Sequence, residues 1–119
     1  MRIYLISPVR KSTPESEAKV SAYVAKLEAQ GHEVFWPLRD GDENLSSFEI
    51  IAGNVEKMRQ ADEIHIWWEP TSEGSVFDFG YAWGTEKPIV LANPEDIEET
   101  SEKSFTNCLL ELCFGYPYL

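Results

Sequence analysis

Four short apolar runs, each bounded by polar or turn residues, predict the buried strands of this chain. They are the segments 2–6, 32–37, 62–68 and 87–92. Continuous apolar runs of this length are typical of strands that are covered on both faces of a sheet.

Between these strands, apolar residues recur three and four positions apart, which predicts helices. In 14–30 this spacing aligns Val20, Val24 and Leu27, and Gly31 suits the end of the helix. The same spacing in 47–60 groups Ile50, Ile51, Val55 and Met58. The predicted helices span 14–30, 47–60, 75–86 and 105–114, and the predicted loops span 38–47, 69–74 and 93–104.

The alternation of strands and helices defines the expected architecture. Helices of this length between strands imply right-handed crossovers and parallel strands. We therefore expect a single domain, 1–119, of the doubly wound α/β class. It would have a flavodoxin- or Rossmann-like parallel sheet of four to five strands with helices on both faces. In such sheets the ligand lies beyond the carboxyl ends of the strands. That rule selects the loops at 7–13, 37–46, 68–75 and from 92 onward.

Composition and charge narrow the class of partner. The chain has 119 residues and a formal net charge of −11, which argues against binding to a nucleic acid polymer. No apolar run approaches the roughly 18 residues that span a bilayer. The first residues lack the apolar core and cleavage site of a signal peptide. We therefore expect a cytoplasmic protein with no membrane partner, and we expect Cys108 and Cys113 to be buried, reduced thiols.

The loop at 7–13 carries several hydrogen-bond donors between a strand and a helix start. Ser7, Arg10, Ser12 and Thr13 lie there. Free backbone N–H groups and the helix dipole favour an anion at such a position. The alternative is a capped helix beside a solvated basic pair. The loop has no glycine, so it is neither a Walker loop nor a dinucleotide fingerprint.

Asp78 is the second chemically informative position. It follows the polar segment of Ser72 and Gly74, and it lies between Phe77 and Phe79. A carboxylate near a helix start can be a favourable surface charge worth about 0.3–1 kcal/mol. Aromatic neighbours instead point to partial desolvation, which raises a carboxyl pKa and is typical of functional sites. His32 and His65 have no partner at metal spacing, so we expect no metal and no cofactor.

The segment 61–90 resembles the nucleoside 2-deoxyribosyltransferase family, which includes 2-deoxynucleoside 5′-monophosphate N-glycosidases. The elements that carry the likeness are Gly74, Asp78, Gly80, Ala82, Lys87 and Pro88. The segments 3–10 and 31–40 resemble the first two strands of the family, so the likeness runs in order from residue 3 to residue 92.

The resemblance implies a glycosyl enzyme in which Asp78 attacks the anomeric carbon of 2-deoxyribose. The base leaves, and another base or water then takes the sugar from the covalent intermediate. The resemblance also implies that Ser7 and Arg10 contact substrate and that Ser72 contacts a 5′-phosphate. It further implies a homodimer or larger assembly, in which Ser104 or Asn107 reaches a neighbouring subunit's site.

Four further positions follow from their places beside strands and loops. Trp36 and Trp68 stand at strand ends and could stack on the base. Arg39 and Asp40 could contact base or sugar, or could form a surface ion pair with each other. The predicted substrate-binding set is Ser7, Arg10, Trp36, Arg39, Asp40, Trp68, Ser72, Gly74, Ser104 and Asn107.

Two positions depart from the family pattern. The family nucleophile is usually glutamate, whereas this chain has the shorter Asp78. An aspartate usually orients that nucleophile, and this chain has Asn54 in its place, which can donate hydrogen bonds but cannot take up a proton. These changes motivate an alternative function, a non-catalytic nucleotide-binding or sensing module on the same fold.

Overall fold

The computed structural model describes residues 1–10 and 12–115 and shows a four-stranded, all-parallel sheet with the strand order β2-β1-β3-β4. The strands are β1 (Arg2–Ile6), β2 (Glu33–Phe35), β3 (Glu63–Ile66) and β4 (Ile89–Leu91). Tyr4 pairs with Phe35 on one side and with Ile64 on the other. The predicted parallel, doubly wound α/β sheet is confirmed.

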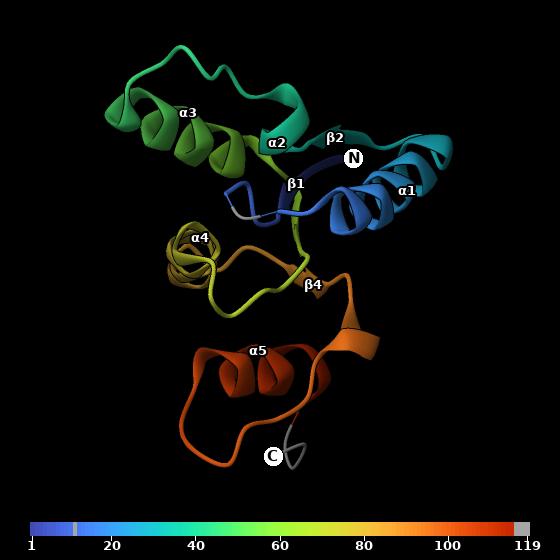
Figure 1. The fold of residues 1–119 in the computed structure, drawn as a ribbon, viewed down its shortest axis with the longest axis vertical. Coiled ribbons are helices and arrows are strands. Elements are labelled where there is room, and N and C mark those ends of the chain that lie inside the picture. Colours follow the sequence, from blue (N-terminus) through green and yellow to red (C-terminus); the bar gives the residue numbers. More distant parts are fainter. Residues whose placement is uncertain (11, 116–119) are drawn as a thin grey trace.

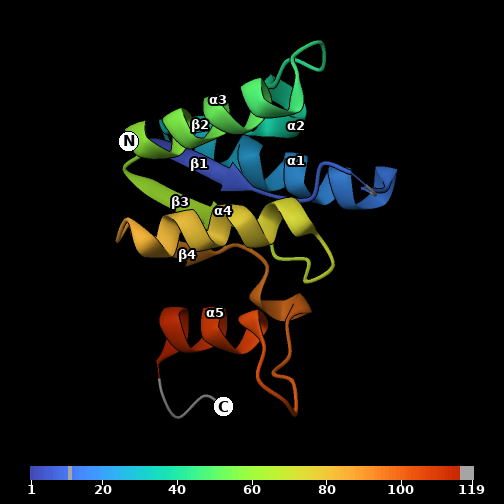
Figure 2. The same cartoon turned by 90° about the vertical axis from the view of Figure 1, so that its left-hand side faces the viewer.

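Helices cover both faces of this sheet (Figures 1 and 2). They are α1 (Pro14–Ala29), α2 (Pro37–Asp40), α3 (Ser47–Gln60), α4 (Glu73–Gly84) and α5 (Phe105–Phe114), with a short 3-10 turn η1 (Pro94–Asp96). In Figure 2, α3 and α4 lie in front of the sheet and α1 lies behind it. None of the described helices combines the length and hydrophobicity that a membrane crossing requires.

The two faces carry separate apolar cores. Behind the sheet, Val20 and Val24 of α1 pack with Ile3 and Leu5 of β1. In front, one larger cluster joins β1 and β3 to α3, α4 and α5. Its buried members are Tyr4, Ile6, Met58, Ala61, Ile64, Ile66, Trp68, Phe79, Ala82, Leu91, Leu109 and Leu110. Residues of opposite parity on β1 therefore face opposite cores, as a pleated strand requires.

The strand order creates a switch point between β1 and β3. From β1 the chain passes through α1 to β2 on one side, and it later returns to β3 on the other side. The loops that follow β1 and β3 therefore diverge, and a crevice opens between them at the carboxyl ends. Three of the predicted functional residues, Ser7, Arg10 and Trp68, follow these two strands directly.

Several predicted boundaries differ from the observed ones. The helix predicted at 75–86 begins two residues earlier, because Ser72 is its N-cap and accepts a hydrogen bond of 3.3 Å from Ser75 N. The short helix α2 overlaps the segment 38–47 that was predicted as a loop, and it begins at Pro37, the last residue of the predicted strand 32–37. By contrast, α3 and α5 have the predicted bounds.

One prediction about burial was wrong, and one predicted helix face is only partly covered. Of the apolar residues predicted on one face of α3, Met58 is fully buried, but Ile50 and Ile51 are exposed because the first half of the helix extends beyond the sheet. Cys108 is exposed rather than buried, since Leu109 and Leu110 take the inner face of α5. Cys113 is half-buried, and both thiols are free.

Candidate active site

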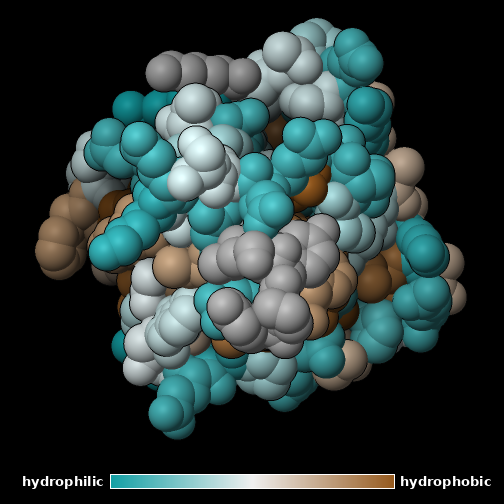
Figure 3. Space-filling view, turned by 90° about the horizontal axis from the view of Figure 1, so that it is seen from below, coloured by the Kyte–Doolittle hydropathy of each residue, from teal (hydrophilic) through white to brown (hydrophobic). Residues whose placement is uncertain are grey.

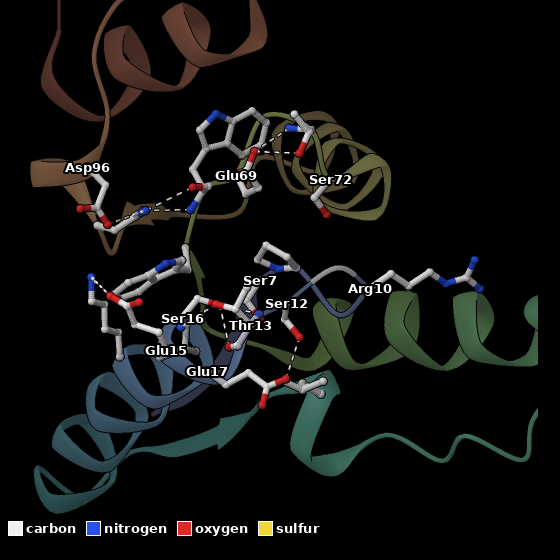
Figure 4. Close-up of a pocket in the computed structure, with 18 of the residues that line it drawn as sticks. Ser7, Arg10, Ser12, Thr13, Glu15, Ser16, Glu17, Glu69, Ser72 and Asp96 are labelled. Carbon is white, nitrogen blue, oxygen red and sulfur yellow. Dashed lines mark hydrogen bonds and ion pairs between the residues drawn. The ribbon is translucent and has the colours of Figure 1, made fainter.

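A cavity of about 430 Å³ lies at the carboxyl ends of the strands, in the crevice between the loops that follow β1 and β3. Five of the predicted substrate-binding residues line it, namely Ser7, Arg10, Trp36, Trp68 and Ser72. In Figure 4, Ser72 at the start of α4 faces the loop that carries Ser7. The topology thus gathers side chains from four separate segments around one space, namely 7–20, 36–38, 67–72 and 93–97.

The loop after β1 is organised mainly by hydrogen bonds within the chain. Thr13 is the N-cap of α1 and accepts a hydrogen bond from Ser16 N, while Ser12 donates to Glu17 at 2.7 Å. Arg10 makes no ion pair with a described residue, and Figure 4 shows it extending away from the other labelled side chains. The capped helix of the alternative interpretation is therefore present, and Arg10 remains the cation available to a ligand.

The two tryptophans at the cavity are held by their indole N–H groups. Trp36 donates to Ser7 Oγ at 2.9 Å, and Trp68 donates to Thr106 Oγ1 at 2.9 Å. Asn93 accepts a further hydrogen bond from Trp68 N. Both rings are almost entirely buried, so they form rigid walls and offer a ligand only a small part of their surface.

Asp78 lies on the inner face of α4 and is only 9% exposed, whereas its neighbour Phe77 is 48% exposed. Burial raises the pKa of Asp78 to about 6, and a hydrogen bond from Tyr4 acts in the opposite direction. The hydroxyl of Tyr4 donates this bond to Oδ2 at 3.3 Å. The desolvated carboxylate that the aromatic neighbours predicted is therefore present.

Asp78 does not line the cavity itself. With Tyr4 it belongs to the side of the sheet that α3 and α4 cover, and Ser72 at the start of its helix reaches the cavity. Oδ1 accepts no hydrogen bond from a described residue, yet it is not fully buried. The carboxylate is thus neither turned outward to bulk solvent nor completely sealed.

Tyr4 is the residue that the sequence analysis missed. A tyrosine inside an apolar strand reads as core, and its ring does stack on Phe35 with centroids 5.7 Å apart. A buried phenol, however, needs a partner for its hydroxyl. The need for a partner could have been inferred from the sequence. The sequence does not show, however, that the partner is Asp78, 74 positions away.

The remaining predicted residues lie outside this cavity. Asn54 on α3 is half-buried and makes no hydrogen bond to Asp78 within the described chain. Gly74 is exposed in the first turn of α4, and a Cβ there would meet no atom within 4 Å. The packing of this chain therefore does not require a glycine at position 74.

Arg39 and Asp40 form the ion pair that was the alternative for them. Arg39 Nε donates to Asp40 at 2.7 Å, and its other nitrogens bind Glu28 and Val34 O. Burial raises the pKa of Asp40, but the guanidinium of Arg39 and the N–H of Trp36 lower it more. Both residues line a second cavity of about 350 Å³ beside β2 and α3.

Ser104 and Asn107 are used within their own chain. Ser104 is the N-cap of α5 and bonds to Thr100 Oγ1 at 2.7 Å. Asn107 is buried and holds the preceding loop through Thr100 and Glu102. The described side chains also contain no group of three potential metal ligands.

Comparisons with known proteins show which family and which fold the chain resembles. The family model for nucleoside 2-deoxyribosyltransferase matches residues 3–109. A 2-deoxyribosyltransferase from Bacillus psychrosaccharolyticus superposes with a TM-score of 0.72 at 22% identity, over 95% of this chain and 82% of that chain. No curated protein sequence matches the chain.

Two further structures share the fold. A 2-desoxiribosyltransferase from Leishmania mexicana has a TM-score of 0.61 at 20% identity, and a conserved protein from Enterococcus faecalis has a TM-score of 0.64 at 17% identity. In both cases 76% of this chain is covered, against 62% of the other chain. This chain therefore spans less than two thirds of these two relatives.

Proposed function

Because the chain belongs to the nucleoside 2-deoxyribosyltransferase family and is an enzyme of that family, we propose that it cleaves the N-glycosidic bond of 2-deoxynucleosides, with Asp78 as nucleophile. An oxygen of Asp78 attacks C1′ of the sugar while the bond to the base breaks and its electrons pass to the base nitrogen, which takes up a proton. A second base or water then attacks C1′ and releases the carboxylate.

The environment of Asp78 is the observation that carries this proposal. A nucleophilic carboxylate must be ionised, partly desolvated and oriented. Asp78 is buried, ionises near pH 6 and is oriented at Oδ2 by Tyr4. Oδ1 accepts no hydrogen bond from a described residue and is the oxygen available for attack. Tyr4 thus joins Asp78 in the proposed machinery.

The charges around the cavity favour uncharged nucleosides over 5′-monophosphates. Four carboxylates line it, and only two cations do. They are Glu15, Glu17, Glu69 and Asp96, against Arg10 and Lys19. A phosphate would meet more repulsion than attraction there, and at physiological ionic strength these charges interact over about 8 Å. Ser72 then serves the sugar or its hydroxyl groups rather than a phosphate.

We further propose that the enzyme works as a homodimer or larger assembly. Large apolar side chains remain exposed on several helices, with Phe48 at 81%, Phe105 at 59% and Trp83 at 48%. Figure 3, which views the molecule from the α5 side, shows apolar patches at its margins with hydrophilic residues between them. A second copy of the chain that covers such surfaces would remove these side chains from water.

Base release measures the proposed activity directly. The wild-type protein, the variants Asp78→Ala and Asp78→Asn, and a control with Asp42→Asn are incubated with 2-deoxynucleosides, with and without an acceptor base. Release or exchange by the wild type and by the control, and its loss in both Asp78 variants, supports the proposal. Full activity of Asp78→Ala would defeat it.

A binding module without turnover is the second candidate, and one observation favours it. Asp78 does not line the cavity, and Asn54 makes no hydrogen bond to it within the described chain. This candidate predicts that a nucleotide raises the unfolding temperature while no product accumulates. A ligand at a hundredfold excess over its dissociation constant stabilises by about 2.7 kcal/mol. Product formed on prolonged incubation excludes this alternative.

A further inference from the structure

Ser75 has a buried hydroxyl group that stability alone does not explain. The residue is 1% exposed and lies on α4, three positions before Asp78. Within the described residues, its Oγ is the one fully buried side-chain oxygen or nitrogen that makes no hydrogen bond. An unpaired buried hydroxyl costs about 1–3 kcal/mol. Alanine would avoid that cost and is a better helix former.

Asp78, in turn, has too few donors for a buried carboxylate. The contact from Tyr4 to Oδ2 is 3.3 Å long, whereas hydrogen bonds between two oxygens are usually about 2.5–3.0 Å. Oδ1 accepts nothing from a described residue. An ionised carboxylate can accept several hydrogen bonds. The charged form of Asp78 is therefore short of donors in the arrangement that the structure shows.

Ser75 can supply the missing donor. Side chains three positions apart on a helix are neighbours, with about 5–6 Å between their Cβ atoms. Both residues lie on the buried face of α4, together with Phe79 and Ala82. This spacing places the hydroxyl of Ser75 and the carboxylate of Asp78 at neighbouring positions on the buried face of one helix.

We propose that Ser75 is a positioning residue whose hydroxyl donates a hydrogen bond to the ionised carboxylate of Asp78 and aligns it for attack. The inference rests on the proposed function, because it assigns Ser75 a part in the same reaction. The shorter side chain of aspartate makes such alignment important, since a misplacement of about 1 Å can cost on the order of a hundredfold in rate. Tyr4 and Ser75 then hold the carboxylate from two elements, β1 and α4.

The variant Ser75→Ala tests this role, because removing the hydroxyl changes kcat and the pH profile only if Ser75 positions Asp78. We expect kcat for base release to fall about tenfold, with KM unchanged within about twofold, as for loss of one hydrogen bond to a charged group. The acid limb of the pH profile moves to higher pH, because the charged form of Asp78 loses a donor. At pH 5, where Asp78 is mostly protonated and Ser75 has no charge to stabilise, the unfolding temperature stays the same or rises. Ser75→Cys, with a similar shape and a weak donor, restores part of kcat.

The matched control is Ser21→Ala, which removes a hydroxyl from an exposed position on α1, outside the cavity. It should leave both kcat and the acid limb unchanged. Wild-type kcat and an unmoved acid limb in Ser75→Ala would overturn the inference. A loss of kcat with an unmoved limb and a lower unfolding temperature would also overturn it, since that pattern indicates a structural serine.

A titration without substrate separates this inference from the proposed function. The carboxyl carbon resonance of Asp78 is followed by NMR from pH 4 to pH 8 in the wild type and in Ser75→Ala. We expect a higher pKa of Asp78 in the variant. If the wild type releases no base, the proposed function fails and this titration still decides the inference. An unchanged titration curve would overturn it.

Discussion

The hydroxyl of Tyr4 donates a hydrogen bond of 3.3 Å to Oδ2 of Asp78 and thereby joins β1 to α4 across the front core of the molecule. Both partners are buried, and desolvation is the largest cause of the raised pKa of each. The pair couples the ionisation of the carboxylate to the position of the central strand. Its removal should therefore be visible in the pH dependence.

Tyr4→Phe should move the acid limb of the activity profile to higher pH and lower the rate. The hydrogen bond from Tyr4 lowers the pKa of Asp78, so its loss leaves burial unopposed and raises that pKa above about 6. Phenylalanine keeps the stacking on Phe35, so folding is preserved. The measurement is kcat/KM for base release against pH. The control Tyr23→Phe loses a hydroxyl that bonds to His65 behind the sheet and should leave the limb in place. Equal shifts in both variants would contradict the assignment.

Asp78→Asn should stabilise the protein at neutral pH. The pKa of Asp78 is about 6 in the folded state and 3.8 as its ordinary value. Between these two pH values the carboxyl group of Asp78 is ionised in the unfolded chain but still protonated in the folded chain. The free energy of unfolding therefore falls as pH rises through this window. The full penalty, at most about 3 kcal/mol, is present above pH 6.

Urea unfolding at pH 4, 5, 6 and 7 checks this prediction. The advantage of Asp78→Asn over the wild type should grow from pH 4 to pH 6 and then level off. Glu99→Gln, which removes an exposed carboxylate elsewhere, is the control and should show no such growth. A variant that is less stable than the wild type at pH 7 would show that the ionised carboxylate is well satisfied in the folded state.

The architecture could be predicted from the sequence because it rests on short-range patterns. The spacing of Val20, Val24 and Leu27 fixed the buried face of α1, and α3 and α5 have the expected bounds. The start of α4 was misplaced because its cap, Ser72, was assigned to the preceding loop. The exposure of Ile50 and Ile51 was unforeseen, since helical spacing shows which residues share a face but not whether anything covers it.

The site was only partly predictable for a related reason. Position relative to strand ends was enough to select Ser7, Trp36 and Trp68, because parallel strands end at one edge. The contact from Tyr4 to Asp78 and the unpaired hydroxyl of Ser75 depend on how side chains pack between distant segments. A buried tyrosine needs a partner for its hydroxyl, but the local sequence around Tyr4 or Ser75 does not identify Asp78 as that partner.

Lys87→Met should destabilise the fold without changing the site. The ammonium group of Lys87 donates to Arg59 O at 2.7 Å and to Ala61 O at 2.8 Å, so it caps the C-terminal end of α3. A cation there also complements the helix dipole. We expect a loss of about 1–2 kcal/mol in the free energy of unfolding. Lys103→Met is the control, because Lys103 is exposed and its side chain makes no hydrogen bond to a described residue. Equal stability of the two variants would contradict the capping role.

The double variant Glu15→Gln and Asp96→Asn should improve the use of 5′-monophosphates relative to nucleosides. Both residues line the cavity, and their loss balances its charges at two against two. We expect the ratio of kcat/KM for monophosphate over nucleoside to rise about fivefold at low salt and less at high salt, because salt screens exposed charges. Glu98→Gln lies outside the cavity and is the control. A ratio that does not respond would show that the phosphate binds elsewhere.

Phe48→Glu should weaken the proposed assembly. Phe48 lies at the start of α3 and is 81% exposed, so a folded monomer gains little from it. If a second copy covers it, a carboxylate there must be desolvated on association, and the dimer loses several kcal/mol. Sedimentation velocity should show the variant as a monomer at concentrations where the wild type is larger, with an unchanged unfolding midpoint for the monomer. The comparison variant is Leu112→Glu, which changes a second exposed apolar residue, on the outer face of α5. Phe114→Glu is less suitable, because Phe114 has contacts within the chain. A wild type that already sediments as a monomer would contradict the assembly and leave the exposed phenylalanine without a partner.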